Sequence, residues 1–153
     1  MENVKEIKLQ LTDITVALCY GRNAAINYHN MVTGEDGNET IANEFTLGLA
    51  LRYKDMDTVN DSSNSDTYLI YINDDIVNFN DICKVLVHEI SHVVDFTMEY
   101  METNDTEYRA HLTSYLYAEF TSYLRVKHTE PEDITSFNSE NLNKDNTEGG
   151  SNE

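Results

Sequence analysis

The chain has 153 residues, 40% of them hydrophobic, and its 28 acidic and 10 basic residues give a net charge of −18. This length suits one domain with a sizeable core and leaves little room for a second. The charge repels nucleic-acid phosphates and anionic lipid headgroups, so we expect no binding to nucleic acid or to membranes. No stretch approaches the roughly 18 apolar residues of a membrane span, and the charged start MENVKEIKLQ is unlike a signal peptide. Cys19 and Cys83 form no C-x-x-C pair, which favours a reducing cytoplasm over a disulfide framework or a cysteine metal site.

The first 75 residues predict a small sheet. Residues 7–21, IKLQLTDITVALCYG, alternate between apolar and polar and then become mostly apolar, which indicates one or two strands that turn at Gly21. Two further strands, FTLGLALRY (45–53) and TYLIYIN (67–73), are predicted to form a hairpin with a long, mobile loop. The loop, residues 54–67, lacks the spacing of a calcium-binding loop, so we expect a solvated connection there.

After this sheet the apolar spacing becomes helical. Asn78 or Asn80 can cap the first helix. The apolar side of this helix contains Ile82, Val85, Leu86, Ile90, Val93 and Val94. A second helical pattern runs from about Asp105 to Val126, with Leu112, Tyr115, Leu116, Phe120 and Leu124 on one side. The short link between the two patterns makes the helices antiparallel neighbours.

These elements predict an α+β fold. Residues 1–127 form one domain, in which a short antiparallel or mixed sheet packs against the first of these helices and the helix that follows. Residues 128–153 contain the only proline of the chain and are rich in Asn, Glu, Ser and Gly. This composition predicts a disordered acidic tail that carries no chemistry.

The segment VLVHEISHVVDF, residues 85–96, contains the pattern H-E-x-x-H. On a helix, His88 and His92 lie about 6 Å apart on the same side, so both rings can bind one zinc ion. Glu89 then lies beside the ion, where a carboxylate can take a proton from zinc-bound water. The alternative is a core helix in which the histidines are partly buried and Glu89 faces solvent.

The third zinc ligand must come from elsewhere in the chain. The extended metzincin pattern would require a glycine at Asp95 and a histidine at Met98, so it is absent. The following helix offers Asp105, Glu107 and His111, of which the last two are four residues apart and share a side. Asn104-x-x-Glu107 is also typical of a capping box, in which the glutamate caps the helix and binds no metal. His111 has its own alternative as a supporting residue or a surface residue.

The sequence VHEISHVVDF followed by TEYRAHLTSYLYAEF resembles a group of small bacteriophage-encoded zinc metallopeptidases, and more distantly the zincins of the gluzincin type. The resemblance covers about residues 68–120. It implies a zincin-like domain in which His88 and His92 are the first two zinc ligands and Glu89 is the general base. It also implies Glu107 as the third ligand, with Ala110 as its small neighbour. The remaining candidates are His111, Asp105 and Tyr115, as supporting residues or as alternative ligands.

The function that follows is zinc-dependent hydrolysis of peptide bonds, with a peptide or protein as substrate. Tyr108, Arg109, His111 or Tyr115 can donate a hydrogen bond to the developing charge, and the sequence does not choose among them. The acidic surface favours neutral or basic peptides. A phage product of this kind would work in the cytoplasm of the infected bacterium or within a virion.

Two other functions compete with this prediction. The first is a zinc-binding protein of the zincin fold that acts in assembly or interaction without catalysis. The second is a metal-free acidic protein that mimics nucleic acid and blocks a basic partner. Changes to His88 and His92 would leave this second function intact.

Overall fold

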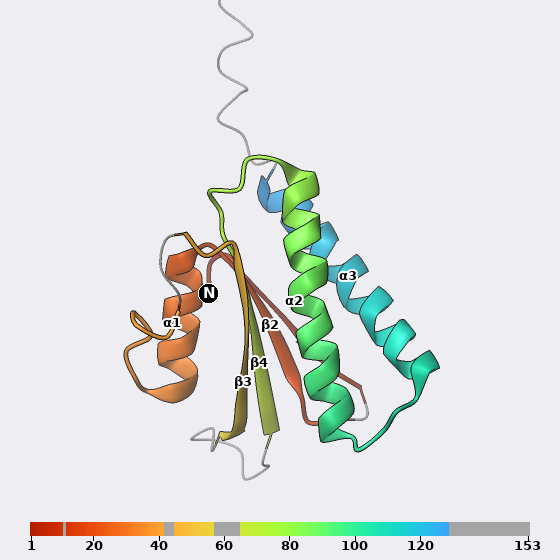
Figure 1. Ribbon diagram of the computed structural model, residues 1–153. Coiled ribbons are helices and arrows are strands. Elements are labelled where there is room, and N and C mark those ends of the chain that lie inside the picture. Colours follow the sequence, from red (N-terminus) through yellow and green to blue (C-terminus); the bar gives the residue numbers. More distant parts are fainter. Residues whose placement is uncertain (11, 42–44, 57–64, 129–153) are drawn as a thin grey trace, which may run out of the picture.

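A four-stranded mixed sheet forms the centre of the protein (Figure 1). The computed structural model describes residues 1–10, 12–41, 45–56 and 65–128. In chain order the elements are β1 (Val4–Lys8), β2 (Thr15–Tyr20), α1 (Arg22–Thr33), β3 (Gly48–Met56), β4 (Ser65–Ile72), α2 (Phe79–Tyr100) and α3 (Thr106–His128). The strands lie in the order β1-β2-β4-β3; β2 and β4 are parallel, and each outer strand is antiparallel to its neighbour. The predicted α+β fold and the β3–β4 hairpin are therefore confirmed.

Helices cover both faces of this sheet, with α2 and α3 on one face and α1 on the other (Figure 1). The two central strands are apolar on both sides for this reason, because alternate residues enter different cores. In β2, Val16 and Leu18 pack towards α2 and α3, whereas Ala17 and Cys19 pack towards α1. The continuous apolar runs of β2 and β4 in the sequence are thus the mark of a sheet buried on both faces.

Helix α1 was not predicted from the sequence. It lies between Gly21 and Gly34, and Gly34 ends it with a φ of 73° and an N–H that donates to the Asn30 carbonyl. Its buried residues are Ala25, Ile26, Tyr28 and His29. In the sequence, the two glycines and the helical spacing of these residues are the signal that indicates α1.

Helices α2 and α3 are antiparallel neighbours, as predicted (Figure 1). Asn78 caps α2, since its side chain accepts the N–H of Asn80 at 2.8 Å. The cap of α3 is Asp105, one residue after Asn104, the cap of the alternative capping box, because Asp105 Oδ1 accepts the N–H groups of Glu107 at 2.9 Å and Tyr108 at 3.1 Å. The buried residues of α3 are Leu112, Leu116, Phe120 and Leu124.

The exposure of Tyr115 and the end of α3 both differ from the prediction. Tyr115 was placed on the apolar side of α3 but is 48% exposed, because it lies about 100° around the helix from Leu116. Helix α3 extends to His128, one residue beyond the predicted domain boundary, and the predicted tail from 129 lies outside the described residues, as does loop 57–64. Within the described ranges, no helix combines the length and the hydropathy that crossing a bilayer requires.

Candidate metal centre

The two histidines of the motif lie one turn apart on the exposed side of α2. The Nε2 atoms of His88 and His92 are 3.3 Å apart, and their rings are nearly perpendicular at 89°. Two nitrogens that bind one tetrahedral zinc ion at 2.0–2.1 Å lie about 3.3–3.4 Å from each other. An N–H···N hydrogen bond between neutral rings has a similar length, so the metal-free protein can hold the same geometry. The spacing of the pair thus fits two ligands of one ion and equally a hydrogen bond between the two rings.

The fold of α2 explains why both rings face outwards. Leu86 and Ile90 are fully buried against the sheet, and His88 lies two residues from each. Two residues correspond to about 200° around a helix, so His88 points away from the core, and His92 follows it four residues later. The apolar residues that bury α2 thus also set the direction of the histidines.

Glu89 is buried, with 6% of its surface exposed, so the alternative in which it faces solvent is wrong. It lies against the start of β3, where a Cβ atom on Gly48 would come within 3.0 Å of Glu89 Oε1. Burial raises the pKa of the Glu89 carboxyl, and positive charge on His88 and His92 opposes part of that rise. Within the described part of the chain, no residue donates a hydrogen bond to this carboxylate or forms an ion pair with it. A proton acceptor with a raised pKa therefore lies beside the histidine pair.

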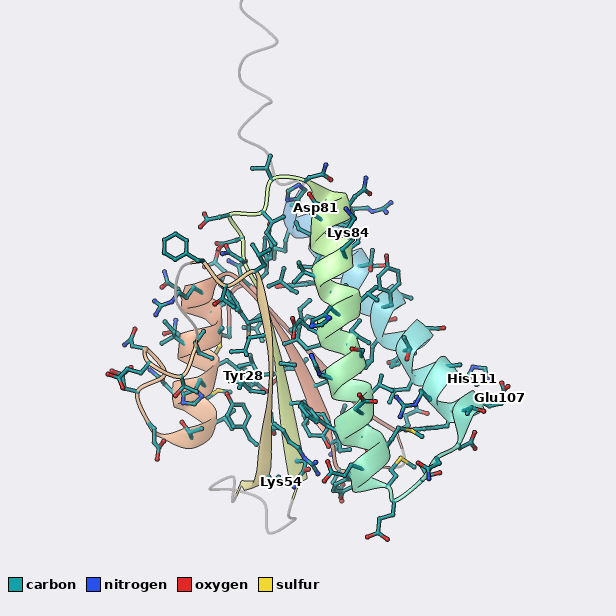
Figure 2. The ribbon with its side chains drawn as sticks, in the orientation of Figure 1. Tyr28, Lys54, Asp81, Lys84, Glu107 and His111 are labelled. Atoms are coloured by element: carbon teal, nitrogen blue, oxygen red, sulfur yellow. The ribbon has the colours of Figure 1, made fainter. Side chains whose placement is uncertain are left out.

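Helix α3 does not bring the predicted third ligand to this pair. Glu107 and His111 are exposed and lie on the outer side of α3, away from α2 (Figure 2). Glu107 precedes the buried Leu112 by five residues, which places it about 140° around the helix from the packed side. His111 instead lines a separate cavity with Tyr115. Among the described residues, no three His, Cys, Asp or Glu side chains come together as a metal-binding group.

Asp105 serves the fold in the structure, since it caps α3 as described above. The carboxylate that follows the histidines along α2 is Asp95, three residues after His92, and it forms an ion pair with Arg109 of α3. Both side chains are about half exposed. Of the four hydrogen-bond donors suggested by the sequence, Arg109 is thus the one with a described ion pair to α2.

Arg52 on β3 is a charged residue that packs against α2 and that the sequence interpretation missed. Its guanidinium donates to Asp66 at 3.2 Å and to Glu99 at 2.9 Å, and it lies over the rings of Tyr68 and Phe96. These contacts connect β3 to the second half of α2. The signal in the sequence is an arginine that directly follows the apolar first half of the strand, residues 48–51.

Comparisons with protein-family models, with curated proteins and with solved structures find no match for this chain. The resemblance to phage metallopeptidases and to zincins therefore stays a prediction based on the motif residues.

Proposed function

We propose that the protein is a zinc-dependent peptidase in which His88 and His92 bind the metal and Glu89 is the general base. The observation that carries this proposal is the histidine pair itself, whose Nε2 atoms are separated by the 3.3 Å that a shared tetrahedral ion requires. The buried Glu89 beside the pair supports it, because a carboxylate costs stability there and contributes none of the described hydrogen bonds.

A bound zinc ion supplies Lewis acidity and lowers the pKa of its water to about 7. Glu89 accepts the proton of the attacking water and later donates it to the leaving amine. Its raised pKa suits this role, since the carboxyl must hold the proton between the two steps. We assign to Arg109, which is paired with Asp95, the role of stabilising the negative charge that develops on the substrate during the reaction.

The position of β3 supports a peptide as the substrate. It is an outer strand of the described sheet, with β4 on one side, and its first residue Gly48 contacts Glu89. An extended peptide can add to such an edge through main-chain hydrogen bonds. A peptide bound there would run past the carboxylate of Glu89.

The test combines metal content with cleavage of a peptide library, in the presence and absence of a chelator. We expect about one zinc per chain and cleavage that the chelator abolishes. Glu89→Gln should keep the zinc and lose the cleavage, whereas His111→Ala, on the outer side of α3, should keep both. Wild-type cleavage by zinc-loaded Glu89→Gln would refute the role of Glu89.

One observation favours a second function, a zinc-binding interaction protein without catalysis. Catalytic zinc sites have three protein ligands as a rule, and the described residues supply two at this pair. The same experiment separates the two functions, because the interaction protein would bind zinc through His88 and His92 and cleave no peptide in the library.

A further inference from the structure

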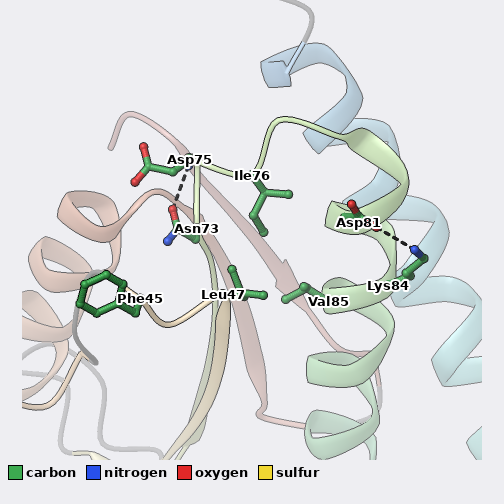
Figure 3. Close-up of a pocket in the computed structure, with 8 residues that line it drawn as sticks. All are labelled: Phe45, Leu47, Asn73, Asp75, Ile76, Asp81, Lys84 and Val85. Atoms are coloured by element: carbon green, nitrogen blue, oxygen red, sulfur yellow. Dashed lines mark hydrogen bonds and ion pairs between the residues drawn. The ribbon is translucent and has the colours of Figure 1, made fainter.

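A cavity of about 550 Å³ opens next to the candidate metal centre, between the start of α2 and the start of β3 (Figure 3). Its apolar wall consists of Phe45, Leu47, Ile76 and Val85. Ile76 and Val85 pack on the main core, whereas Phe45 and Leu47 are 81% and 56% exposed. Large apolar side chains around a hollow of this size are typical of a binding pocket for an apolar group.

The cavity wall and Glu89, the proposed general base, both lie close to Gly48. A Cβ atom on Gly48 would lie 2.4 Å from Val85 Cγ1 and 3.0 Å from Glu89 Oε1. The wall atom of Val85 and the carboxylate oxygen can therefore be no farther apart than the sum of these distances. On the same helix, Lys84 of the cavity precedes His88 by one turn. A peptide held beside Glu89 thus has the cavity within reach of a neighbouring side chain.

The charged residues at the rim of the cavity favour some peptides with an apolar side chain over others. Asp75, Asp81 and Lys84 line it, and Lys84 Nζ is paired with Asp81 Oδ1 at 2.7 Å. The rim is left with an excess of one negative charge, on a chain of net charge −18. A basic residue beside the apolar one is attracted to this rim, and an acidic residue is repelled.

We propose that this cavity is a substrate subsite that binds a large apolar side chain, such as leucine or phenylalanine, next to a lysine or arginine of the same peptide. The assignment to a substrate rests on the proposed peptidase function, whereas the binding of the apolar side chain does not.

The experiment measures binding separately from cleavage. Blocked tetrapeptides acetyl-Ala-Lys-Leu-Ala-amide, its Leu-to-Ala analogue and its Lys-to-Glu analogue are titrated by NMR into the full chain in EDTA. We expect the leucine peptide to bind at least about tenfold more tightly than the alanine analogue, because three buried carbon atoms are lost. The glutamate analogue should bind about threefold more weakly, as a solvent-exposed charge contact predicts.

Leu47→Ser tests the wall, because its side chain is exposed and its substitution does not disturb the core. It should abolish the preference for leucine, whereas Val77→Ser, which removes an even more exposed apolar side chain outside the cavity wall, should preserve it. Equal affinity for the leucine and alanine peptides, absence of saturable binding, or an unchanged preference in Leu47→Ser would each overturn the subsite.

Cleavage of the same peptides by zinc-loaded protein distinguishes the two proposals. If the leucine peptide binds through Leu47 but is never cleaved, the binding pocket stands and the peptidase function fails. If peptides are cleaved without any preference for leucine, the peptidase stands and the subsite fails.

Discussion

Substitution of Gly48 by alanine tests the closest approach between β3 and α2. The added Cβ would lie 2.4 Å from Val85 Cγ1 and 3.0 Å from Glu89 Cγ. Carbon atoms pack at about 3.5–4.0 Å, so the contact with Val85 must open by more than about 1 Å. Overpacking of this kind costs about 1–3 kcal/mol. Alanine also restricts the unfolded chain, which returns about 0.4–1 kcal/mol because Gly48 lies in a strand whose backbone alanine can adopt. We therefore expect Gly48→Ala to lower the free energy of unfolding by about 1–2 kcal/mol.

Urea unfolding followed by circular dichroism measures this change, and a double-mutant cycle identifies its cause. Val85→Ala removes the nearer of the clashing atoms, so the double variant should lose less stability than the two single variants together. The coupling should be about 1 kcal/mol, and incomplete, because Glu89 still contacts position 48. If Gly48→Ala is as stable as the wild type, or if the two changes are additive, β3 does not approach α2 as described.

The remaining predictions concern the site and its neighbours. Burial raises the pKa of Glu89, so the folded protein loses stability as the pH rises from the ordinary value of 4.5 through the raised value. Glu89→Gln should thus unfold at higher urea concentration than the wild type at neutral pH, and the difference should vanish below pH 4.5. His88→Ala and His92→Ala should each abolish the rise in Tm that zinc produces, as scanning fluorimetry will show. Glu107→Gln should leave the zinc content, measured by elemental mass spectrometry, unchanged. If Glu107 were the third ligand, the same substitution would lower the zinc content. Asp105→Ala should lower the free energy of unfolding by about 1 kcal/mol in the same urea assay, because α3 loses its cap.

Local patterns in the sequence were sufficient to predict most of the strands and helices. The change from alternating to helical spacing near Asn78 marks the end of the sheet and the start of α2, and the asparagine side chain fixes the first turn. The burial of the apolar stripe of α2 follows from its 3.6-residue period. The outward direction of His88 and His92 follows from the same period, so this part of the candidate site was predictable.

The direction of Glu107 also follows from the local spacing of residues. Its spacing from Leu112, Leu116 and Phe120 already placed it away from the packed side of α3. Glu107 was nevertheless predicted as the third ligand, because the resemblance implies a glutamate ligand on the following helix and because Glu107 shares a side with His111. In the structure Glu107 is exposed, as this spacing requires.

Contacts between distant segments were not predictable from local patterns. Gly48 is an ordinary strand residue by sequence, and its role follows only once β3 lies against Val85 and Glu89. The ion pairs of Arg52 likewise join residues 14 and 47 positions away along the chain. Such contacts depend on the order of the strands, which the sequence alone left open.

The burial of Glu89 is a feature that stability alone does not explain. An apolar residue at this position would pack beside Gly48 without the cost of moving a carboxylate out of water. The described residues offer this carboxylate no hydrogen bond that would offset the cost. The core likewise does not require two exposed histidines one turn apart, with their Nε2 atoms 3.3 Å from each other, because the opposite side of α2 packs in the core. Because buried groups with a perturbed pKa gather at functional sites, the turn from His88 to His92 is where chemistry, rather than folding, explains the choice of residues.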